Sequence, residues 1–442
     1  MKKITILSFV VFLLNLFCVS TALGESGYVS GTLKHFNKMG NYCPSYRDCT
    51  GAKYPHTQYN TALPVKNAKV TLNVVFNQGS GETVIPIGSG STDSTGYYKF
   101  YWYINPSNWT NYTTNGMFQL RWNPAHKDNR FTIKNSSGAT WFFWGAVSSL
   151  TSGTTSSSPQ SLGTKQWGSS NSPNALTNLY EGAERMWENL STSSRMNTYF
   201  TGVDIIAWDN SVCSSSCAYG DLKKIIIDSE DSAYKPQGRV MHEMGHIASH
   251  LASRDQSVKT CAYLISSYNY GTQTGTDWSL NSPENGCIQF EEGLATFLAD
   301  TAFYSQDAVS PATCISDGIC DLMLEPSSGA VGTCALGEDR WALTVDRFLW
   351  DLYDDNADFT ADTFTYSLSD LIEVIYTFPN GTGSYQKNEP WDSTLTSVTE
   401  PDGRSGTDYL YHFIYDFLGF PGIPVLTDLL TIYTSNCAPV GQ

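Results

Sequence analysis

Two histidines and a glutamate stand at a spacing that can hold a metal ion and use it. Residues 240–250 read VMHEMGHIASH, so His242 and His246 are four positions apart and Glu243 lies between them. On an α-helix this spacing brings both imidazoles to one face, where they can bind one Zn²⁺ through ring nitrogens. Glu243 lies toward the same side and can reach a water molecule on the metal. The segment therefore predicts a zinc site that activates water.

A catalytic zinc ion needs a third protein ligand and one open position. Residues 290–300, FEEGLATFLAD, offer Glu291 and Glu292 at the start of a second apolar helix. Here the chain resembles the gluzincin metallopeptidases, in which an HExxH helix is followed by a glutamate ligand on a later helix. In several of those families the ligand stands in a Glu-Gly-x-Ala sequence, which residues 292–295 match. The resemblance implies Glu292 as the third ligand, with Glu291 as the alternative.

The same resemblance implies a mechanism for hydrolysis of a peptide bond. Zinc lowers the pKa of its water and polarises the scissile carbonyl, while Glu243 takes the water's proton and passes it to the leaving amine. In similar enzymes a tyrosine or histidine from a C-terminal helix stabilises the oxyanion. The candidates here are Tyr409, Tyr411 and His412, and Asp300 is the candidate for orienting a metal-binding histidine.

Other metal-ligand assignments fit less well. His250 continues the face of the two motif histidines, but a third ligand one turn further along a single helix is geometrically strained. Asp277, after Gly275 and Thr276, only weakly matches the context of an aspartate ligand. A separate oxygen-rich cluster after Trp350 is compatible with Ca²⁺, although it lacks EF-hand spacing and a solvated acidic loop is favoured. That cluster comprises Asp351, Asp354, Asp355, Asn356, Asp358 and Asp362.

The first 24 residues predict export. Lys2 and Lys3 precede an apolar run from Ile4 to Cys18, and small residues follow up to Gly24, which is the order of a secretory signal peptide (residues 1–24). We therefore expect a secreted or cell-envelope protein. The ten cysteines that remain predict up to five disulfides. The sequence does not fix the pairing, but short loops suggest Cys43–Cys49, Cys213–Cys217 and Cys314–Cys320. A pair Cys261–Cys287 would close the loop between the two motifs, and Cys334 and Cys437 remain as the last pair.

The elements that must carry these residues are predicted to form two domains. Residues 25–150 contain short alternating strands between turns, which predicts an all-β sandwich. The sequences Pro64-Val-x-x-Ala-x-Val-x-Leu72 and Thr92-Asp-x-x-Gly-x-Tyr-x-Phe100 are similar to those of transthyretin-like, carboxypeptidase-regulatory-like modules. Residues 151–174 are rich in Ser, Thr and Gly and are predicted to be a linker or loop, with a last strand over residues 162–167 as the alternative. The expected class is α+β, with this sandwich followed by a zincin-like α+β metallopeptidase domain.

Residues 175–442 are assigned to that catalytic domain. Helical spacing of apolar residues predicts helices after Pro173, from about Pro236 past Leu251, and over residues 291–303 and 338–353. Ser369 is predicted to cap a helix over residues 370–377, and Thr407 one over residues 408–418. A strand at residues 222–228 precedes the motif helix, where it can serve as an ordinary sheet strand or as an edge that binds an extended peptide.

Composition limits the remaining functions. The chain has 26 Lys and Arg against 42 Asp and Glu, a formal charge of −16, which argues against a non-specific nucleic-acid binder and against docking on an anionic membrane. No stretch after the signal peptide reads as a membrane span. The sequence predicts an exported zinc metallopeptidase acting on a protein or peptide, and it gives no oligomeric state. The alternatives are an extracellular binding protein with a structural or inactive zinc site, and a zinc hydrolase of other bonds.

Overall fold

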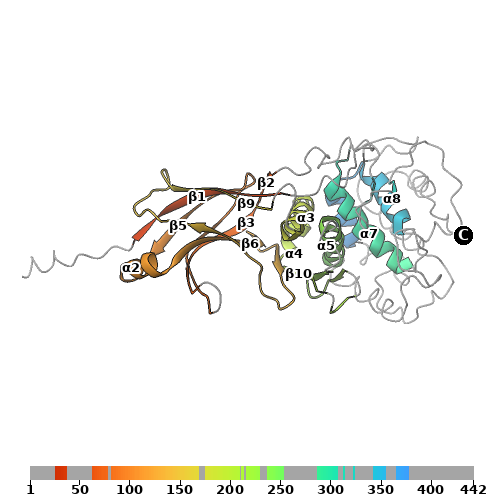
Figure 1. Cartoon of the computed structure of the whole chain (residues 1–442). Helices are drawn as coiled ribbons and strands as arrows, with labels where there is room; N and C mark the ends of the chain where they lie inside the picture. The colour runs from red at the N-terminus through yellow and green to blue at the C-terminus, as the bar shows by residue number, and fades with distance from the viewer. Residues whose placement is uncertain are drawn as a thin grey trace, which may run out of the picture. The chain divides into compact units, whose positions relative to one another are not determined.

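The computed structural model combines an N-terminal β-sheet region with a helical region, so the α+β class is confirmed (Figure 1). It describes residues 25–36, 62–77, 81–168, 175–209, 211–213, 216–228, 236–252, 286–306, 312–313, 322–323, 342–354 and 365–377. The chain divides into two compact units. The β unit comprises Met1–Lys34, Pro64–Asn123 and Phe142–Gln166, and the helical unit comprises His35–Leu63, Pro124–Trp141 and Trp167–Gln442.

The β unit is built on strands in the order β6-β3-β4-β5-β1. The strand β8 pairs with β6, β9 pairs with β1, and the short β2 also lies beside β1. Their bounds are β1 Glu25–Phe36, β2 Ala62–Pro64, β3 Ala68–Phe76, β4 Thr83–Ser91, β5 Tyr97–Ile104, β6 Met117–His126, β8 Phe143–Val147 and β9 Gln160–Trp167. Strand β9 lies within the range of the predicted linker and agrees with the alternative of a last strand there. It forms despite its polar composition because its backbone pairs with β1.

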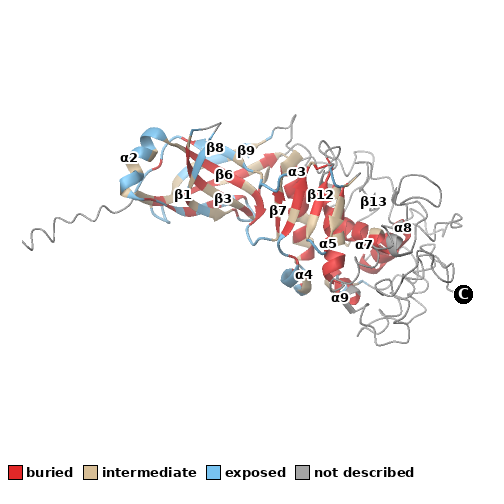
Figure 2. Cartoon of the chain, turned by 90° about the horizontal axis from the view of Figure 1, so that it is seen from below, coloured by how far each residue is buried: buried red, intermediate tan, exposed pale blue. Residues whose placement is uncertain are grey.

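Alternation along β5 shows why this sheet forms. Tyr98, Phe100, Trp102 and Ile104 are buried, while Lys99, Tyr101 and Tyr103 between them are exposed, as in a sheet that is covered on one face. Figure 2 shows buried, intermediate and exposed residues along the strands of this unit. Trp102 stacks on Trp109 at 5.9 Å between ring centroids. Trp109 belongs to helix α2 (Pro106–Asn115), which the all-β prediction for residues 25–150 missed. Asn105 starts this helix by accepting a hydrogen bond from the Ser107 backbone N–H.

The helical unit contains a second group of strands and six described helices. Its sheet order is β11-β12-β10-β7, with β10 parallel to both neighbours and β11 antiparallel at the edge. Helix α5 packs on α3 and α7, and α7 also packs on α8. The bounds are β7 Phe131–Lys134, α3 Ala175–Leu190, α4 Ser194–Tyr199, β10 Val203–Ala207, β11 Cys217–Tyr219, β12 Lys224–Ile227, α5 Pro236–Ala252, α7 Gly286–Phe303, β13 Ala312–Thr313, β14 Leu322–Met323, α8 Ala342–Tyr353 and α9 Leu368–Thr377.

The residue that caps helix α9 lies two positions before the predicted cap. The hydroxyl of Ser367, not Ser369, accepts a hydrogen bond from the Asp370 backbone N–H at 3.2 Å. The Asp370 carboxylate in turn accepts from the Ser367 backbone N–H at 3.2 Å and from its hydroxyl at 2.6 Å. This reciprocal capping box satisfies donors at both positions, which explains why the earlier serine is preferred.

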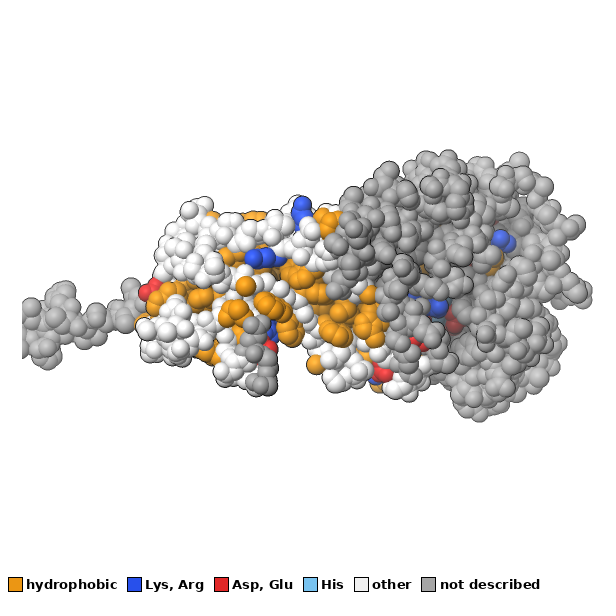
Figure 3. All heavy atoms as spheres, in the orientation of Figure 1, with side chains coloured by type: hydrophobic (Ala, Val, Ile, Leu, Met, Phe, Trp, Pro, Cys, Tyr) orange, Lys and Arg blue, Asp and Glu red, His pale blue; other side chains and the backbone are white. Residues whose placement is uncertain are grey.

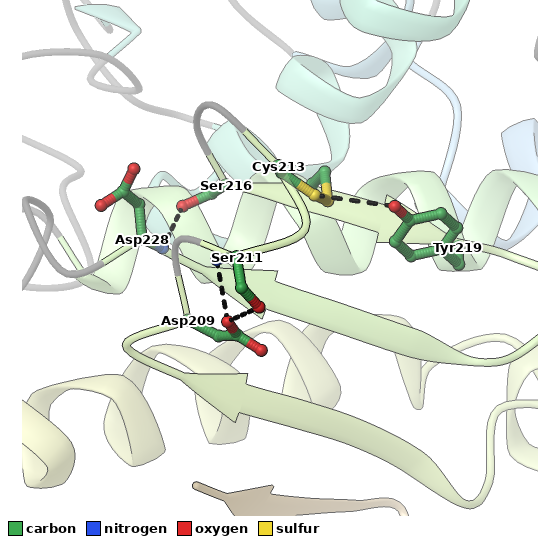
Figure 4. Close-up of a disulfide and its surroundings, with 7 residues drawn as sticks. Asp209, Ser211, Cys213, Ser216, Tyr219 and Asp228 are labelled. Atoms are coloured by element: carbon green, nitrogen blue, oxygen red, sulfur yellow. Dashed lines mark hydrogen bonds between the residues drawn. A yellow bond between two sulfur atoms is a disulfide. The ribbon is translucent and has the colours of Figure 1, made fainter. Parts of the chain in front are cut away.

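The loop before β11 carries the one disulfide among the described residues, Cys213–Cys217, which confirms that predicted pair (Figure 4). Asp209 accepts two hydrogen bonds from Ser211, and these hold the pKa of the Asp209 carboxyl below its usual range. The signal peptide and the helix over residues 408–418 lie outside the described residues. Each of the remaining predicted disulfide pairs includes at least one cysteine that also lies outside them. None of the helices in the described part of the chain combines the length and apolar character that a membrane crossing requires.

Candidate metal centre

Helices α5 and α7 bring three potential metal ligands together. The Nε2 atom of His242 lies 3.0 Å from Oε2 of Glu292 and 3.2 Å from Nε2 of His246. The third separation, from Nε2 of His246 to Oε2 of Glu292, is 3.4 Å. Among the described residues this is the one group of three or more histidine, cysteine or acidic side chains with ligand atoms close enough to share a metal ion.

These separations match the ligand spacing of a tetrahedral zinc ion. Zinc binds imidazole nitrogen and carboxylate oxygen at about 2.0–2.2 Å, so tetrahedral ligands lie roughly 3.3–3.5 Å apart. The three observed separations of 3.0, 3.2 and 3.4 Å are at or slightly below that range. A small shift of the side chains would centre an ion among them, and the arrangement leaves room for a fourth ligand from solvent because His246 and Glu292 remain partly exposed.

A glycine lets the two helices approach closely at this point. A Cβ atom on Gly245 would lie 2.6 Å from the backbone oxygen of Ala295, which is too close for any side chain. One turn further along α5, the Ser249 hydroxyl donates a hydrogen bond to Oε2 of Glu291 at 3.1 Å. The sequence between His242 and Ser249 therefore provides both the ligands and the helix contact that aligns them with α7.

The charges at the site depend on one another. Burial lowers the pKa of His242 to about 4, despite a raising effect of Glu292. Burial also acts to lower the pKa of His246, but the charges of Glu292 and Glu243 outweigh it and raise that pKa to about 9. For Glu292 the penalty of burial is outweighed by the charge of His246 and by the close contacts with the two imidazoles, so its pKa is held well below the usual range. Glu292 and His246 therefore each favour the charged form of the other.

The other sequence candidates lie in different surroundings. Burial raises the pKa of Glu291, the alternative ligand, to about 7, and its carboxyl contacts Ser249 and is not part of the ligand group. His250 is fully buried outside the group, against Gly220, where a Cβ atom would lie 2.5 Å from the imidazole. Glu243 is buried on α5, next to His242 in the sequence, and its charge contributes to raising the pKa of His246.

Two further sequence candidates lie on α7 and α8. Asp300 is buried and lies beside Asp346 of α8, and its role in orienting a metal-binding histidine stays a prediction. Asp351 and Asp354 of the proposed calcium cluster are buried, in contrast to the solvated loop that was favoured. The other four cluster members, and the oxyanion candidates Tyr409, Tyr411 and His412, lie outside the described residues.

Sequence reasoning also missed one residue that contacts the site. The hydroxyl of Thr296 lies 3.4 Å from Nδ1 of His242. The available signal was its position four residues after Glu292, which places it one turn along the same helix face.

Comparison with known proteins adds no family. No family model and no curated protein matches the chain. One solved structure that shares some geometry is the crystal structure of a 9R-lipoxygenase from Cyanothece PCC8801, with 14% sequence identity and a TM-score of 0.20. The match covers 58% of this chain, and the chain spans about a quarter (27%) of that protein. A likeness at this level says nothing about function, so the function must be argued from the site.

Proposed function

We propose that the protein is an exported, zinc-dependent hydrolase of peptide bonds. The observation that carries the proposal is the convergence of His242, His246 and Glu292 at 3.0–3.4 Å, with Glu243 beside them on the same helix. Two imidazoles and one carboxylate form the ligand set of catalytic zinc sites that keep a fourth position for water. Export is supported by the predicted signal peptide and by the Cys213–Cys217 disulfide.

Each residue of the site has a chemical role in this proposal. When bound, Zn²⁺ supplies a Lewis acid and a water molecule of lowered pKa. Glu243 accepts the proton of the attacking water and delivers it to the leaving nitrogen. The burial of Glu243, and its position next to His242 in the sequence of α5, support this role. Glu292 and the two histidines hold their positions through the contact of α5 with α7.

The test compares metal content and turnover in matched variants. We expect the purified mature protein to hold one zinc ion and to cleave a denatured protein. Glu243→Gln should keep the zinc and lose turnover by about 10²–10⁴-fold, since it removes only the base. His246→Ala should lose both. Glu188→Gln is the control, because Glu188 lies on α3, pairs with Arg185 and should affect neither property. A wild-type protein without zinc, or full turnover in Glu243→Gln, would contradict the proposal.

A second candidate function rests on the β unit. Tyr97, Tyr101 and Tyr103 are exposed in a row along β5, and Tyr28 meets Tyr101 edge to face at 5.4 Å. On the face seen in Figure 3, hydrophobic side chains, tyrosine included, gather in a band with few charged groups among them. Such surfaces suit an extracellular binding protein whose zinc site is structural or inactive. Stoichiometric zinc without cleavage of any peptide library would favour this candidate.

A further inference from the structure

Thr296 lies between the backbone of its own helix and the ring of His242. It is fully buried on α7, one turn after Glu292. Its hydroxyl donates a hydrogen bond of 2.7 Å to the backbone oxygen of Glu292, and the same oxygen lies 3.4 Å from Nδ1 of His242. The side chain therefore contacts both metal-ligand residues, at atoms that do not face the metal.

The single proton of the hydroxyl determines the direction of these bonds. A carbonyl oxygen can only accept, so the threonine proton is committed to Glu292 and the hydroxyl oxygen can only accept from the imidazole. Nδ1 of His242 must then carry the ring proton. The lone pair of Nε2 is left facing Oε2 of Glu292 and Nε2 of His246, which are the two other atoms of the ligand group. With a metal ion held among these three atoms, only the neutral tautomer that carries its proton on Nδ1 satisfies this geometry.

We propose that Thr296 is a positioning residue that fixes His242 in the tautomer with the proton on Nδ1 and so aims Nε2 at the metal. The inference rests on the proposed metal site and extends it to a residue that does not ligate. Partners of this kind orient a metal-binding histidine, and their loss weakens metal affinity by about 10–100-fold.

Three variants separate positioning from packing. Thr296→Val keeps the shape but removes the oxygen, Thr296→Ser keeps the oxygen, and Thr301→Val is the control. Thr301 is also fully buried on α7 and its hydroxyl also bonds to the helix backbone, but its other partner is Asn189 of α3. Zinc affinity is measured by competition with a chromophoric chelator, and the tautomer of His242 by ¹⁵N chemical shifts of the ring nitrogens in the zinc-bound protein.

We expect Thr296→Val to bind zinc about 10–100-fold more weakly. Thr296→Ser and Thr301→Val should stay close to the wild type, and wild-type Nδ1 should be protonated. Equal affinity for Thr296→Val and wild type would overturn the inference, as would an equal loss in Thr301→Val. If Thr296→Val does not fold, Thr296→Ala replaces it in the affinity comparison, and equal affinity for Thr296→Ala and wild type would overturn the inference. Absence of zinc from every variant and from the wild type would instead contradict the proposed function.

Discussion

The two units bury different kinds of side chain. In the described part of the β unit, the buried polar groups are neutral apart from Arg121, which lies near the surface and bonds to Gln119 and Glu82. The helical unit buries many carboxyl and imidazole groups. They are His35, His126, Glu181, Glu184, Asp209, Asp228, His242, Glu243, His250, Glu291, Asp300, Asp346, Asp351 and Asp354.

This difference indicates where function resides. Burial of an ionisable group destabilises a fold unless the group is paired, so it is retained mainly where a network or a metal site needs it. On α3, Glu181 accepts from Arg185 at 2.7 Å and lies 3.1 Å from His35. This helix packs on both α5 and α7. Ionic pairs therefore support the helices that carry the candidate ligands, whereas the β unit is held by aromatic and aliphatic packing.

The strongest test of the comparison removes a large apolar side chain from the β unit. Trp102→Ala should lower the free energy of unfolding of that unit by about 3–5 kcal/mol, since Trp102 is fully buried and stacked on Trp109. Urea unfolding followed by circular dichroism measures the loss. Zinc affinity, measured on the same variant, should be unchanged, and a parallel fall in affinity would show that the metal site depends on the β unit.

Metal removal should act on the other unit. With free zinc at 1,000 times its dissociation constant, binding to the folded state adds about 4 kcal/mol to the free energy of unfolding. Chelation should therefore lower the thermal midpoint of the helical unit and leave that of the β unit in place. Scanning calorimetry with and without chelator checks this. His246→Ala is the matched control, because added zinc should no longer shift its transition.

A buried acid with no metal role sharpens the comparison. Burial and the neighbouring charge of Asp300 raise the pKa of Asp346 well above its ordinary value of 3.8. The folded protein thus keeps a proton that the unfolded chain releases. Stability is highest below the unfolded pKa, near pH 4, and falls as the pH rises toward the folded pKa. Asp346→Asn imitates the protonated form, so it should stabilise the protein by roughly 1–3 kcal/mol at pH 7 and by little at pH 4.

Asp209 provides the opposite sign. Its pKa is lowered by the hydrogen bonds from Ser211, so its carboxylate form is favoured by folding and Asp209→Asn should destabilise at pH 7. Urea midpoints at pH 4 and pH 7 for both variants measure the difference. A loss of stability at pH 7 in Asp346→Asn would mean that the folded protein favours the negative charge of Asp346. Its burial would then not destabilise the charged form.

The sequence predicts most helices of the site but not how they meet. The spacing of His242 and His246 indicates that both side chains lie on one face of the same helix. The choice between Glu291 and Glu292 stays open in the sequence, because neighbours on a helix point about 100° apart and only the packing partner decides between them. In the structure α5 lies against α7 with Gly245 next to Ala295, and in this arrangement Glu292, not Glu291, belongs to the ligand group.

Long-range pairs and polar elements are the parts that sequence patterns miss. His35 and Glu181 are 146 residues apart, and nothing in either local sequence indicates their contact. Helix α2 has no buried residues and hence no apolar periodicity to reveal it. By contrast, Cys213 and Cys217 are close in sequence, which made their pairing easy to predict.

The smallest expected effect concerns a polar pair at the surface of the helical unit. Ser367 caps α9 through a reciprocal hydrogen-bond pair with Asp370, and both residues are exposed. Ser367→Ala should lower the free energy of unfolding by about 1 kcal/mol, as for other N-cap serines. Ser369→Ala lies within the first turn of the helix and should have almost no effect, or slightly favour the helix because alanine has the higher propensity. Urea midpoints of the two variants test the comparison directly. A larger loss in Ser369→Ala would place the helix start where the sequence alone suggested, whereas a larger loss in Ser367→Ala would support Ser367 as the cap.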